Sequence, residues 1–349
     1  MPEGHSVHRI ARQFDRNFAG HTVSASSPQG RFAEGASVID HRELTAARAV
    51  GKQMFLAFAG KRGPEDLWLR VHLGLYGAWD FAGEILVDPT IASANGRMGQ
   101  TNQRGTELPA DAVFDAAGEN SLASIGAPRR ARDETQRVRV RMSEQTRGLS
   151  DETQPDETDA SWPPAPVGQV RLRLATEVTV ADLRGPTACE LQTPDEMLVQ
   201  LTKLGPDPLV GDASENEERF VRAVRRRAVP IGLLLMDQAV VSGIGNVYRA
   251  ELLYRALLDP HTPGKEVPEE LVRELWRDWA RLLVIGVETG QMMTMDDLDP
   301  EAYRRAMASR DDRHWVYHRA GLPCRVCGTA IVLEEMANRK LYWCPQCQK

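Results

Sequence analysis

The spacing of apolar side chains divides the chain into a strand-rich first part and a helical second part. A helix is predicted over residues 4–19 because its apolar side chains share one face: Val7, Ile10, Phe14 and Phe18. Strand periodicity follows in Arg48–Ala57, in 67–73 and in 170–180. These segments predict a mostly antiparallel β domain of two packed sheets that carries one helix.

The second part begins near Gly205, where the period changes to that of helices. Helices are predicted over four segments: Glu215–Arg227, Ile231–Val240, Val247–Ala256 and Glu269–Gly286. Residues 290–315 have the composition of a loop, and a short hairpin is expected from 330–333 and 341–343. The fold class expected is therefore α+β, with more than one domain.

A polar segment, residues 83–165, interrupts the β part. It is rich in Asp, Glu, Thr, Gln, Pro and Arg and poor in aromatic residues, so it lacks the apolar surface that would offset its ordering entropy. We expect a largely disordered insertion, with Val138–Met142 as one potential strand. The domains predicted are residues 1–82 with 166–195, the insertion 83–165, the helical part 196–300 and the C-terminal part 301–349.

Charge is distributed unevenly along the 349 residues. The whole chain has a formal net charge of −6, but residues 82–166 contribute 14 acidic side chains against nine arginines. Residues 302–349 have nine lysines and arginines against four acids, which is the local basic surface that phosphate binding requires. The apolar runs are too short to span a membrane, so we expect a soluble, cytosolic protein without membrane contact.

Four cysteines near the C-terminus form two CxxC pairs. Cys324 and Cys327 are separated by 16 residues from Cys344 and Cys347, which is the spacing of a four-thiolate zinc ribbon. Two disulfides are the alternative, but nothing in the sequence indicates secretion. Four thiolates leave no open position on the metal, so the zinc expected here is structural.

The N-terminal sequence Met1-Pro2-Glu3-Gly4 carries the first catalytic candidates. Removal of Met1 would expose the secondary amine of Pro2, which is partly neutral near neutral pH and forms a cationic iminium with a carbonyl carbon. Glu3 directly behind it is placed to move protons. The alternative is an ordinary helix start, with proline and an acid at its first positions.

Three further positions have both a structural and a phosphate-binding interpretation. Gly243-Ile244-Gly245-Asn246 joins two helices and is either a pair of helix caps or an anion site at a helix N-terminus, with Arg225–Arg227 upstream. Lys52 follows Gly51 in a turn between strands, and Arg339 lies between the two cysteine pairs. Lys52 and Arg339 are each either a solvated side chain or a phosphate ligand.

Taken together and in this order, these motifs resemble the formamidopyrimidine-DNA glycosylase and endonuclease VIII family of bifunctional DNA repair enzymes. The resemblance also includes Leu73–Gly77, Gly205–Pro208 and Asn338–Cys344, and it covers the chain outside the insertion. It implies an N-terminal β-sandwich, a helix-two-turns-helix domain and a C-terminal zinc ribbon. It also implies DNA with oxidised bases or abasic sites as the partner, one structural zinc, no organic cofactor and a monomer.

The resemblance assigns roles to single residues. Pro2 would attack C1′ of the damaged nucleotide, Glu3 would transfer a proton at the sugar, and Lys52 would assist loss of the base. Asn246 and Arg339 would bind the phosphates around the flipped nucleotide. Strand cleavage would follow by β-elimination, with δ-elimination as an additional step.

Two features indicate the substrate branch. One is Gly4, directly after Glu3, and the other is Leu75-Tyr76, which stands where the family fills the gap left by the flipped base. They are more similar to endonuclease VIII, which favours oxidised pyrimidines. The chain departs from that branch at His5-Ser6, where Pro-Glu is usual, and at Gly74, where a larger residue is common. Arg184 is the candidate for a wedge against the opposite strand, and the alternative for it is a surface loop residue.

Two other classes of function remain open at this point. The chain could bind damaged DNA without chemistry, although the joint presence of Pro2, Glu3 and Lys52 argues against this. It could also be a zinc-ribbon scaffold whose partner binds the acidic insertion. Deleting residues 83–165 would abolish the function of such a scaffold, whereas a glycosylase would still cut DNA.

Overall fold

The computed structural model describes residues 2–75, 77–85, 100–103, 125–126, 162–295, 298–308 and 312–349. Most of the polar insertion, including Val138–Met142, lies outside the described residues, and so does Tyr76. The chain forms two compact units. The first contains Ser6–Ala49 and Gln53–Leu198, and the second contains Val199–Lys349 with the short segments Glu3–His5 and Val50–Lys52.

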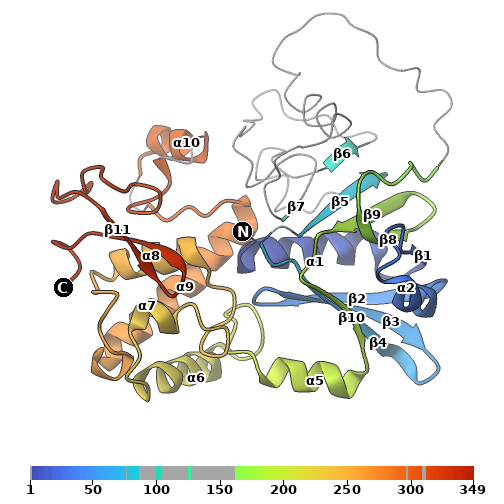
Figure 1. The fold of residues 1–349 in the computed structure, drawn as a ribbon, viewed down its shortest axis with the longest axis horizontal. Coiled ribbons are helices and arrows are strands. Elements are labelled where there is room, and N and C mark those ends of the chain that lie inside the picture. The colour runs from blue at the N-terminus through green and yellow to red at the C-terminus, as the bar shows by residue number, and fades with distance from the viewer. Residues whose placement is uncertain are drawn as a thin grey trace, which may run out of the picture. The chain divides into compact units, whose positions relative to one another are not determined.

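The first unit is built from antiparallel strands (Figure 1). Its strands are β1 (His21–Ser26), β2 (Arg42–Val50), β3 (Gln53–Gly60), β4 (Gly63–His72), β5 (Ala78–Gly83), β6 (Gln100–Gln103), β7 (Ile125–Gly126), β8 (Val170–Ala175), β9 (Thr179–Arg184) and β10 (Ala188–Gln192). The strand order along the sheet path is β10-β4-β3-β2-β1-β8-β9-β5-β6, and β7 pairs with β5. The one parallel pair among the described strands is β5 with β6.

Strand β1 joins the two halves of this path by changing partner along its length. His21 pairs with Leu44 of β2, whereas Ser24 pairs with Ala175 of β8. One sheet therefore continues from β1 through β2, β3, β4 and β10, and the other continues through β8, β9 and β5. This arrangement confirms the predicted β-sandwich.

Helix α1 (Gly4–Phe18) supplies the aromatic centre of the first unit's core. In Figure 1 its blue ribbon lies between the β2–β3–β4–β10 layer and the β5–β8–β9 layer. Phe14 contacts Trp79 and Phe81 of β5 edge-on, with ring centroids 4.7 and 5.2 Å apart. The apolar face predicted over residues 4–19 is thus buried as expected. The short helix α2 (Ala33–Ile39) packs beside β1.

The second unit is mainly helical. Its helices are α5 (Pro194–Thr202), which begins in the first unit, α6 (Ala213–Arg225), α7 (Ile231–Leu234), α8 (Asn246–Arg255), the 3₁₀ turn η1 (Gly264–Glu266), α9 (Glu269–Thr289) and α10 (Pro300–Ala308). Apolar side chains of α6, α7, α8 and α9 share one core. Among the helices that the structure describes, none is long and apolar enough to cross a membrane.

The C-terminal hairpin consists of β11 (Val332–Met336) and β12 (Arg339–Trp343), which pair antiparallel. Ala337 and Asn338 form the turn with positive φ angles of 49° and 59°, which is the conformation of a tight two-residue hairpin turn. A second small core links this ribbon to Ala250 and Tyr254 of α8.

Several predicted boundaries were wrong. The apolar run 231–240 is helical only to Leu234, because the side chains of Asp237 and Gln238 bind backbone N–H groups of the turns that follow. Residues 290–315 contain α10 rather than loop alone, since a polar surface helix leaves little apolar periodicity. Strands β1, β5 and β10 and helices α2 and α5 were not anticipated.

Candidate active site

The turn before α8 brings backbone segments from distant parts of the second unit together. Gly243 has a φ of 95°, a conformation that favours glycine, and its carbonyl accepts the N–H of Gly4 at 2.9 Å. A Cβ atom on Gly245 would lie 2.6 Å from the Oε1 of Glu3. The two glycines therefore allow the N-terminal segment to approach the start of α8 closely.

The carboxylate of Glu3 occupies the N-terminus of α8. Its Oε2 accepts the N–H of Gly245 at 2.8 Å, and its Oε1 accepts the N–H of Val247 at 2.9 Å. These donors are among the backbone groups that a helix start leaves unpaired, and the helix dipole also favours an anion there. The sequence indicated an anion site at this turn, and its occupant in the structure is a side chain of the protein.

Burial raises the pKa of Glu3, because only 1% of the residue is exposed and the charged form loses its water. The positive charge of Lys52 and the two N–H donors act in the opposite direction. A raised pKa favours the protonated form of Glu3 relative to an ordinary carboxyl group, which suits a residue that must donate a proton.

Lys52 provides the cation of the site. It lies in the turn after Gly51, as predicted, and burial lowers its pKa to about 8, while Glu3 raises the pKa and Arg339 lowers it. An ordinary lysine has a pKa of about 10.4. The Lys52 ammonium is therefore a stronger acid than that of an ordinary lysine.

Asn246 is the first residue of α8, and its side chain contacts the C-terminal hairpin. Its Nδ2 donates to the carbonyl of Lys340 at 2.7 Å, and its Oδ1 accepts from Arg249 at 2.6 Å. Arg249 donates to the same carbonyl at 3.1 Å. The N-cap position belongs to Gly245, so Asn246 is not a cap, and it attaches the helix start to β12.

Arg339 opens strand β12, where it pairs with Met336 directly after the two-residue turn. Its side chain is exposed, and its charge lowers the pKa of both Lys52 and Arg249. Burial is the larger cause for Arg249, whose pKa falls to about 10. The structure thus gathers Glu3, Lys52 and Arg339, three of the four predicted catalytic residues, around the start of α8.

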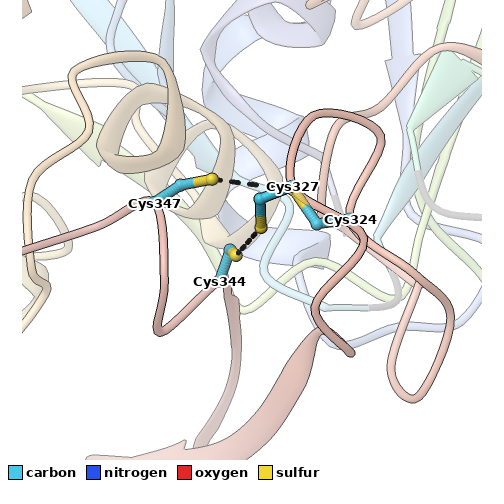
Figure 2. Close-up of side chains that lie close together, drawn as sticks. All are labelled: Cys324, Cys327, Cys344 and Cys347. Atoms are coloured by element: carbon cyan, nitrogen blue, oxygen red, sulfur yellow. Dashed lines mark hydrogen bonds between the residues drawn. The ribbon is translucent and has the colours of Figure 1, made fainter.

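The four cysteines predicted to bind zinc lie together at the base of the ribbon (Figure 2). All four sulfur atoms are within 4.8 Å of one another. The separation is 3.9 Å between Cys324 and Cys347 and 3.5 Å between Cys327 and Cys344. Tetrahedral Zn²⁺ with Zn–S bonds of about 2.3 Å requires sulfur separations of about 3.8 Å. The donor set therefore fits one structural zinc ion.

The zinc ligands also contact α8. The hydroxyl of Tyr254, near the C-terminal end of the helix, lies 3.1 Å from the sulfur of Cys324. Such hydrogen bonds orient metal ligands and stabilise thiolate charge. One helix therefore contacts Glu3 at its first turn and the zinc ligands at its last.

Comparisons with known proteins agree with this architecture. Family models match three consecutive parts: the formamidopyrimidine-DNA glycosylase N-terminal domain over residues 1–189, the H2TH domain of the same enzyme over 204–297, and a zinc finger found in FPG and IleRS over 321–349. Endonuclease 8 1 of Mycobacterium tuberculosis is 35% identical over 348 residues, with 100% of each chain covered.

The chain belongs to the formamidopyrimidine-DNA glycosylase and endonuclease VIII family of DNA repair enzymes. A formamidopyrimidine-DNA glycosylase of Thermus thermophilus is 36% identical over 151 residues, which is 42% of this glycosylase and 54% of the relative. The wild-type enzyme of Lactococcus lactis, solved with DNA that contains N7-benzyl-Fapy-dG, matches with a TM-score of 0.63 at 17% identity over 100% of both chains. At that identity the likeness shows the fold alone.

Two of the expected gap-filling residues lie after β4 of this glycosylase. Leu75 is 43% exposed, and Tyr76 lies outside the described residues. Gly74, where the family often has a larger residue, has a φ of 65°, and a Cβ atom there would collide with Thr187. This turn is therefore built for glycine, and the exposed apolar side chain follows one position later.

Arg184, the wedge candidate, lies on β9 and is 12% exposed at its side chain. Its guanidinium forms an ion pair with Asp80 and donates to the carbonyl of Val167 at 3.2 Å. Burial lowers its pKa to about 10. These contacts give Arg184 a structural role within the sheet, and its role as a wedge stays a prediction.

The arginines upstream of the glycine turn, at the end of α6 and just after it, pair with acidic side chains. Arg225 forms an ion pair with Glu269 at 2.6 Å, and Arg227 forms one with Asp237 at 2.8 Å. Both pairs are partly exposed, and each neutralises a charge that the sequence interpretation left available for DNA. The positive charge of Arg225 and Arg227 is therefore partly balanced within the protein.

Sequence reasoning missed three residues that shape the site. Arg249, one helical turn after Asn246, donates hydrogen bonds to the Asn246 side chain and to the Lys340 carbonyl. Its spacing of three residues from Asn246 on the predicted helix could have indicated the first of these contacts. Asp207 accepts the N–H of Gly51 in the Lys52 turn, and the sequence motif Gly205–Pro208 gives no role to its side chain. Glu251 is buried and accepts the N–H groups of the segment that leads into the ribbon.

Proposed function

We propose that this protein is a bifunctional DNA glycosylase and AP lyase that removes oxidised bases, with oxidised pyrimidines as the preferred substrates. Membership of the family supports the reaction class. One observation carries the assignment of residues: the Glu3 carboxylate is buried at the N-terminus of α8, beside a Lys52 whose pKa is lowered to about 8. A purely structural DNA-binding protein has no need of this acid and cation pair.

The first step is base excision. With Met1 removed, the neutral amine of Pro2 attacks C1′ of a nucleotide turned out of the duplex, and the glycosidic bond breaks. The leaving base takes its proton from the Lys52 ammonium, while the sugar opens when Glu3 protonates the ring oxygen. After the attack the Pro2 nitrogen gives its proton to water and becomes the iminium nitrogen as the sugar ring opens. The protons from Lys52 and Glu3 end on the base and on the ring oxygen, so charge and protons balance.

The second step is strand cleavage. The iminium withdraws electrons from C2′, so a proton leaves C2′ and the C3′–O bond breaks by β-elimination. Water then hydrolyses the iminium and restores the Pro2 amine. Glu3 is deprotonated after the first step, and its carboxylate is the group available to accept the C2′ proton.

DNA binding would use the cationic surface around β12. We propose that Arg339 and Asn246 bind the phosphates beside the flipped nucleotide, and that Leu75 and Tyr76 fill the gap left in the duplex. The exposure of Arg339 and Leu75 supports these roles. Solved structures of the Lactococcus lactis enzyme contain Fapy-dG, abasic-site or oxidised-pyrimidine DNA, which supports damaged DNA as the ligand class.

We propose domain boundaries close to those predicted from the sequence. The β-sandwich would comprise residues 1–82 and 166–195, the helix-two-turns-helix domain 196–300, and the ribbon 301–349, with 83–165 as an insertion. The spans of the three family models support this division. Limited proteolysis followed by mass spectrometry would test it.

The decisive experiment traps the covalent intermediate. Tagless protein is incubated with borohydride and duplex oligonucleotides that carry thymine glycol or an abasic site, because borohydride reduces the iminium to a stable amine. We expect a protein–DNA adduct that peptide mapping assigns to Pro2. A Pro2→Gly variant would trap more weakly, since a primary amine must be protonated to give the cationic imine.

A form that retains Met1 is the matched control, because its Pro2 nitrogen is an amide without nucleophilicity. It should bind DNA and give no adduct. Absence of an adduct from tagless protein with either lesion, despite measurable DNA binding, would overturn the proposal and favour a non-catalytic binder.

A further inference from the structure

Asp207 is a buried carboxylate at the junction of three backbone segments of the second unit. It is 3% exposed, and its Oδ2 accepts the N–H of Gly51 at 2.6 Å. Its Oδ1 accepts the N–H of Leu209 at 2.9 Å. A buried carboxylate that accepts backbone donors at both oxygens fixes those donors in place, because leaving either group unpaired is costly.

The turn that Asp207 holds has little freedom to lie elsewhere. Gly51 has a φ of 58°, and a Cβ atom on it would be 2.6 Å from the Cβ of Ser242 and 2.9 Å from the N of Gly243. Ser242 is itself held by the same loop, since its N–H donates to Pro206 and its hydroxyl donates to Gly205. The Asp207 loop therefore supports both the Lys52 turn and the glycine turn that precedes α8.

The position of Lys52 depends on this support. A lysine side chain has a flexible four-carbon stem, so its ammonium is placed only as well as the backbone from which it starts. Burial lowers the Lys52 pKa to about 8 and Glu3 raises it, so both effects depend on where that ammonium lies. A shift of the turn toward solvent would weaken both.

We propose that Asp207 is a positioning residue for Lys52. Its carboxylate fixes the Gly51–Lys52 turn against the glycine turn before α8, so that the ammonium lies beside Glu3 and delivers a proton to the leaving base. This inference rests on the proposed function, because it assigns Asp207 to base excision rather than to strand cleavage at an existing abasic site.

The test compares two reactions of one protein: excision of thymine glycol and cleavage of DNA that already contains an abasic site. In Asp207→Asn one oxygen is replaced by an NH₂ group that opposes a backbone N–H. We expect single-turnover base excision to fall on the order of 10²-fold, as a misplaced catalytic group does, while abasic-site cleavage changes only a few-fold. The alkaline limb of base excision should also move to higher pH, since a solvated Lys52 regains an ordinary pKa.

Asp212→Asn is the matched control. Asp212 is an exposed carboxylate that caps α6 by accepting the N–H of Glu215 at 2.8 Å, and asparagine caps a helix equally well. It should leave the ratio of the two reactions unchanged. Asp207→Glu retains both acceptor oxygens and should restore part of the ratio that Asp207→Asn loses.

Lys52→Gln separates failure of this inference from failure of the proposed function. If Lys52→Gln lowers both reactions equally, the role of Lys52 in base excision is wrong. If Lys52→Gln separates the two reactions and Asp207→Asn does not, the inference on Asp207 is overturned while the function stands. Should Asp207→Asn fail to fold, Asp207→Glu decides. It keeps both acceptor oxygens on a side chain one carbon longer, so its ratio should lie between those of the wild type and Lys52→Gln, and a ratio and pH profile equal to those of the wild type would overturn the proposal.

Discussion

Two buried glutamates are associated with helix α8, Glu3 at its N-terminus and Glu251 within it, and they differ in what surrounds them. At the N-terminal end Glu3 accepts the N–H groups of Gly245 and Val247, with that of Tyr248 more distant at 3.5 Å, and faces the charge of Lys52. Farther along, Glu251 accepts the N–H groups of Trp315, Val316 and Tyr317 and the hydroxyl of Thr294. Burial raises the pKa of both.

Burial of a carboxyl group therefore suits catalysis at Glu3 and stabilises the fold at Glu251. Glu251 has four donors and holds the segment that leads into the zinc ribbon. Glu3 has backbone donors as well, but it also faces a lysine whose pKa is lowered to about 8, which is a second group that can give or accept a proton. A buried carboxylate that shares its surroundings with a second group of shifted pKa is a candidate for catalysis.

Replacing Glu3 should have the largest effect of the changes considered. Glu3→Gln keeps the shape of the side chain but removes its exchangeable proton, so we expect base excision to fall about 10²- to 10⁴-fold, the usual contribution of a general acid or base. Single-turnover cleavage of DNA with one thymine glycol measures this rate. DNA affinity should change little.

Glu251→Gln is the control for this prediction, because it makes the same chemical change at the other glutamate. It should reduce the free energy of unfolding in urea by about 2 kcal/mol, the scale of hydrogen bonds to a charged group, and leave the rate per folded molecule near that of the wild type. Equal loss of rate in Glu3→Gln and Glu251→Gln would show that the two glutamates do not differ in function.

Removing one hydrogen bond at the zinc end gives the next largest effect. Tyr254→Phe deletes the hydroxyl that lies 3.1 Å from Cys324, so the thiolate loses a donor. We expect zinc affinity to fall about 10- to 100-fold, as for other groups that support metal ligands. Competition with a chromophoric chelator measures the affinity.

Tyr303→Phe is the matched control, since Tyr303 is a partly exposed residue of α10. It should bind zinc as the wild type does. With zinc in excess, Tyr254→Phe should recover DNA binding, because the ribbon that carries Arg339 is then complete. A variant that binds zinc normally would show that the hydroxyl does not support the ligand.

The zinc end was predictable from sequence and the catalytic end was only partly so. Two CxxC pairs fix their own geometry, because each pair lies within one tight turn and the metal requires all four sulfur atoms. The sequence also placed Lys52 in a turn and a helix after Gly245. These are local properties, which spacing and glycine positions specify.

Contacts between distant segments were not predictable in this way. The sequence pointed to a phosphate at the start of α8, but the carboxylate of Glu3, 244 positions before Val247, accepts those N–H groups. Arg184, interpreted from the sequence as a wedge or as a surface loop residue, lies on β9 and is paired with Asp80. In both cases the partner is set by tertiary packing, for which hydrophobic periodicity carries no signal.

The pH dependence of base excision tests whether Lys52 donates the proton to the leaving base. It is the smallest change in rate predicted. Lys52, with a pKa of about 8, donates a proton only below that pH, so base excision should decline as pH rises through about 8. Lys52→Arg keeps a proton to far higher pH and should remove this decline, at a lower maximal rate because the guanidinium is a weaker acid. Rates at fixed ionic strength from pH 6 to 10 measure both limbs.

The same group sets the sign of a stability effect that serves as an independent check. Between pH 8 and the ordinary lysine pKa of about 10.4, the folded protein binds fewer protons at Lys52 than the unfolded chain does. The free energy of unfolding should therefore gain a contribution that rises with pH across this window. Lys52→Met, which carries no proton in either state, should lose that contribution. Identical slopes for Lys52→Met and wild type would mean that the ammonium is solvated, and the proton donor for the leaving base would then have to be sought elsewhere.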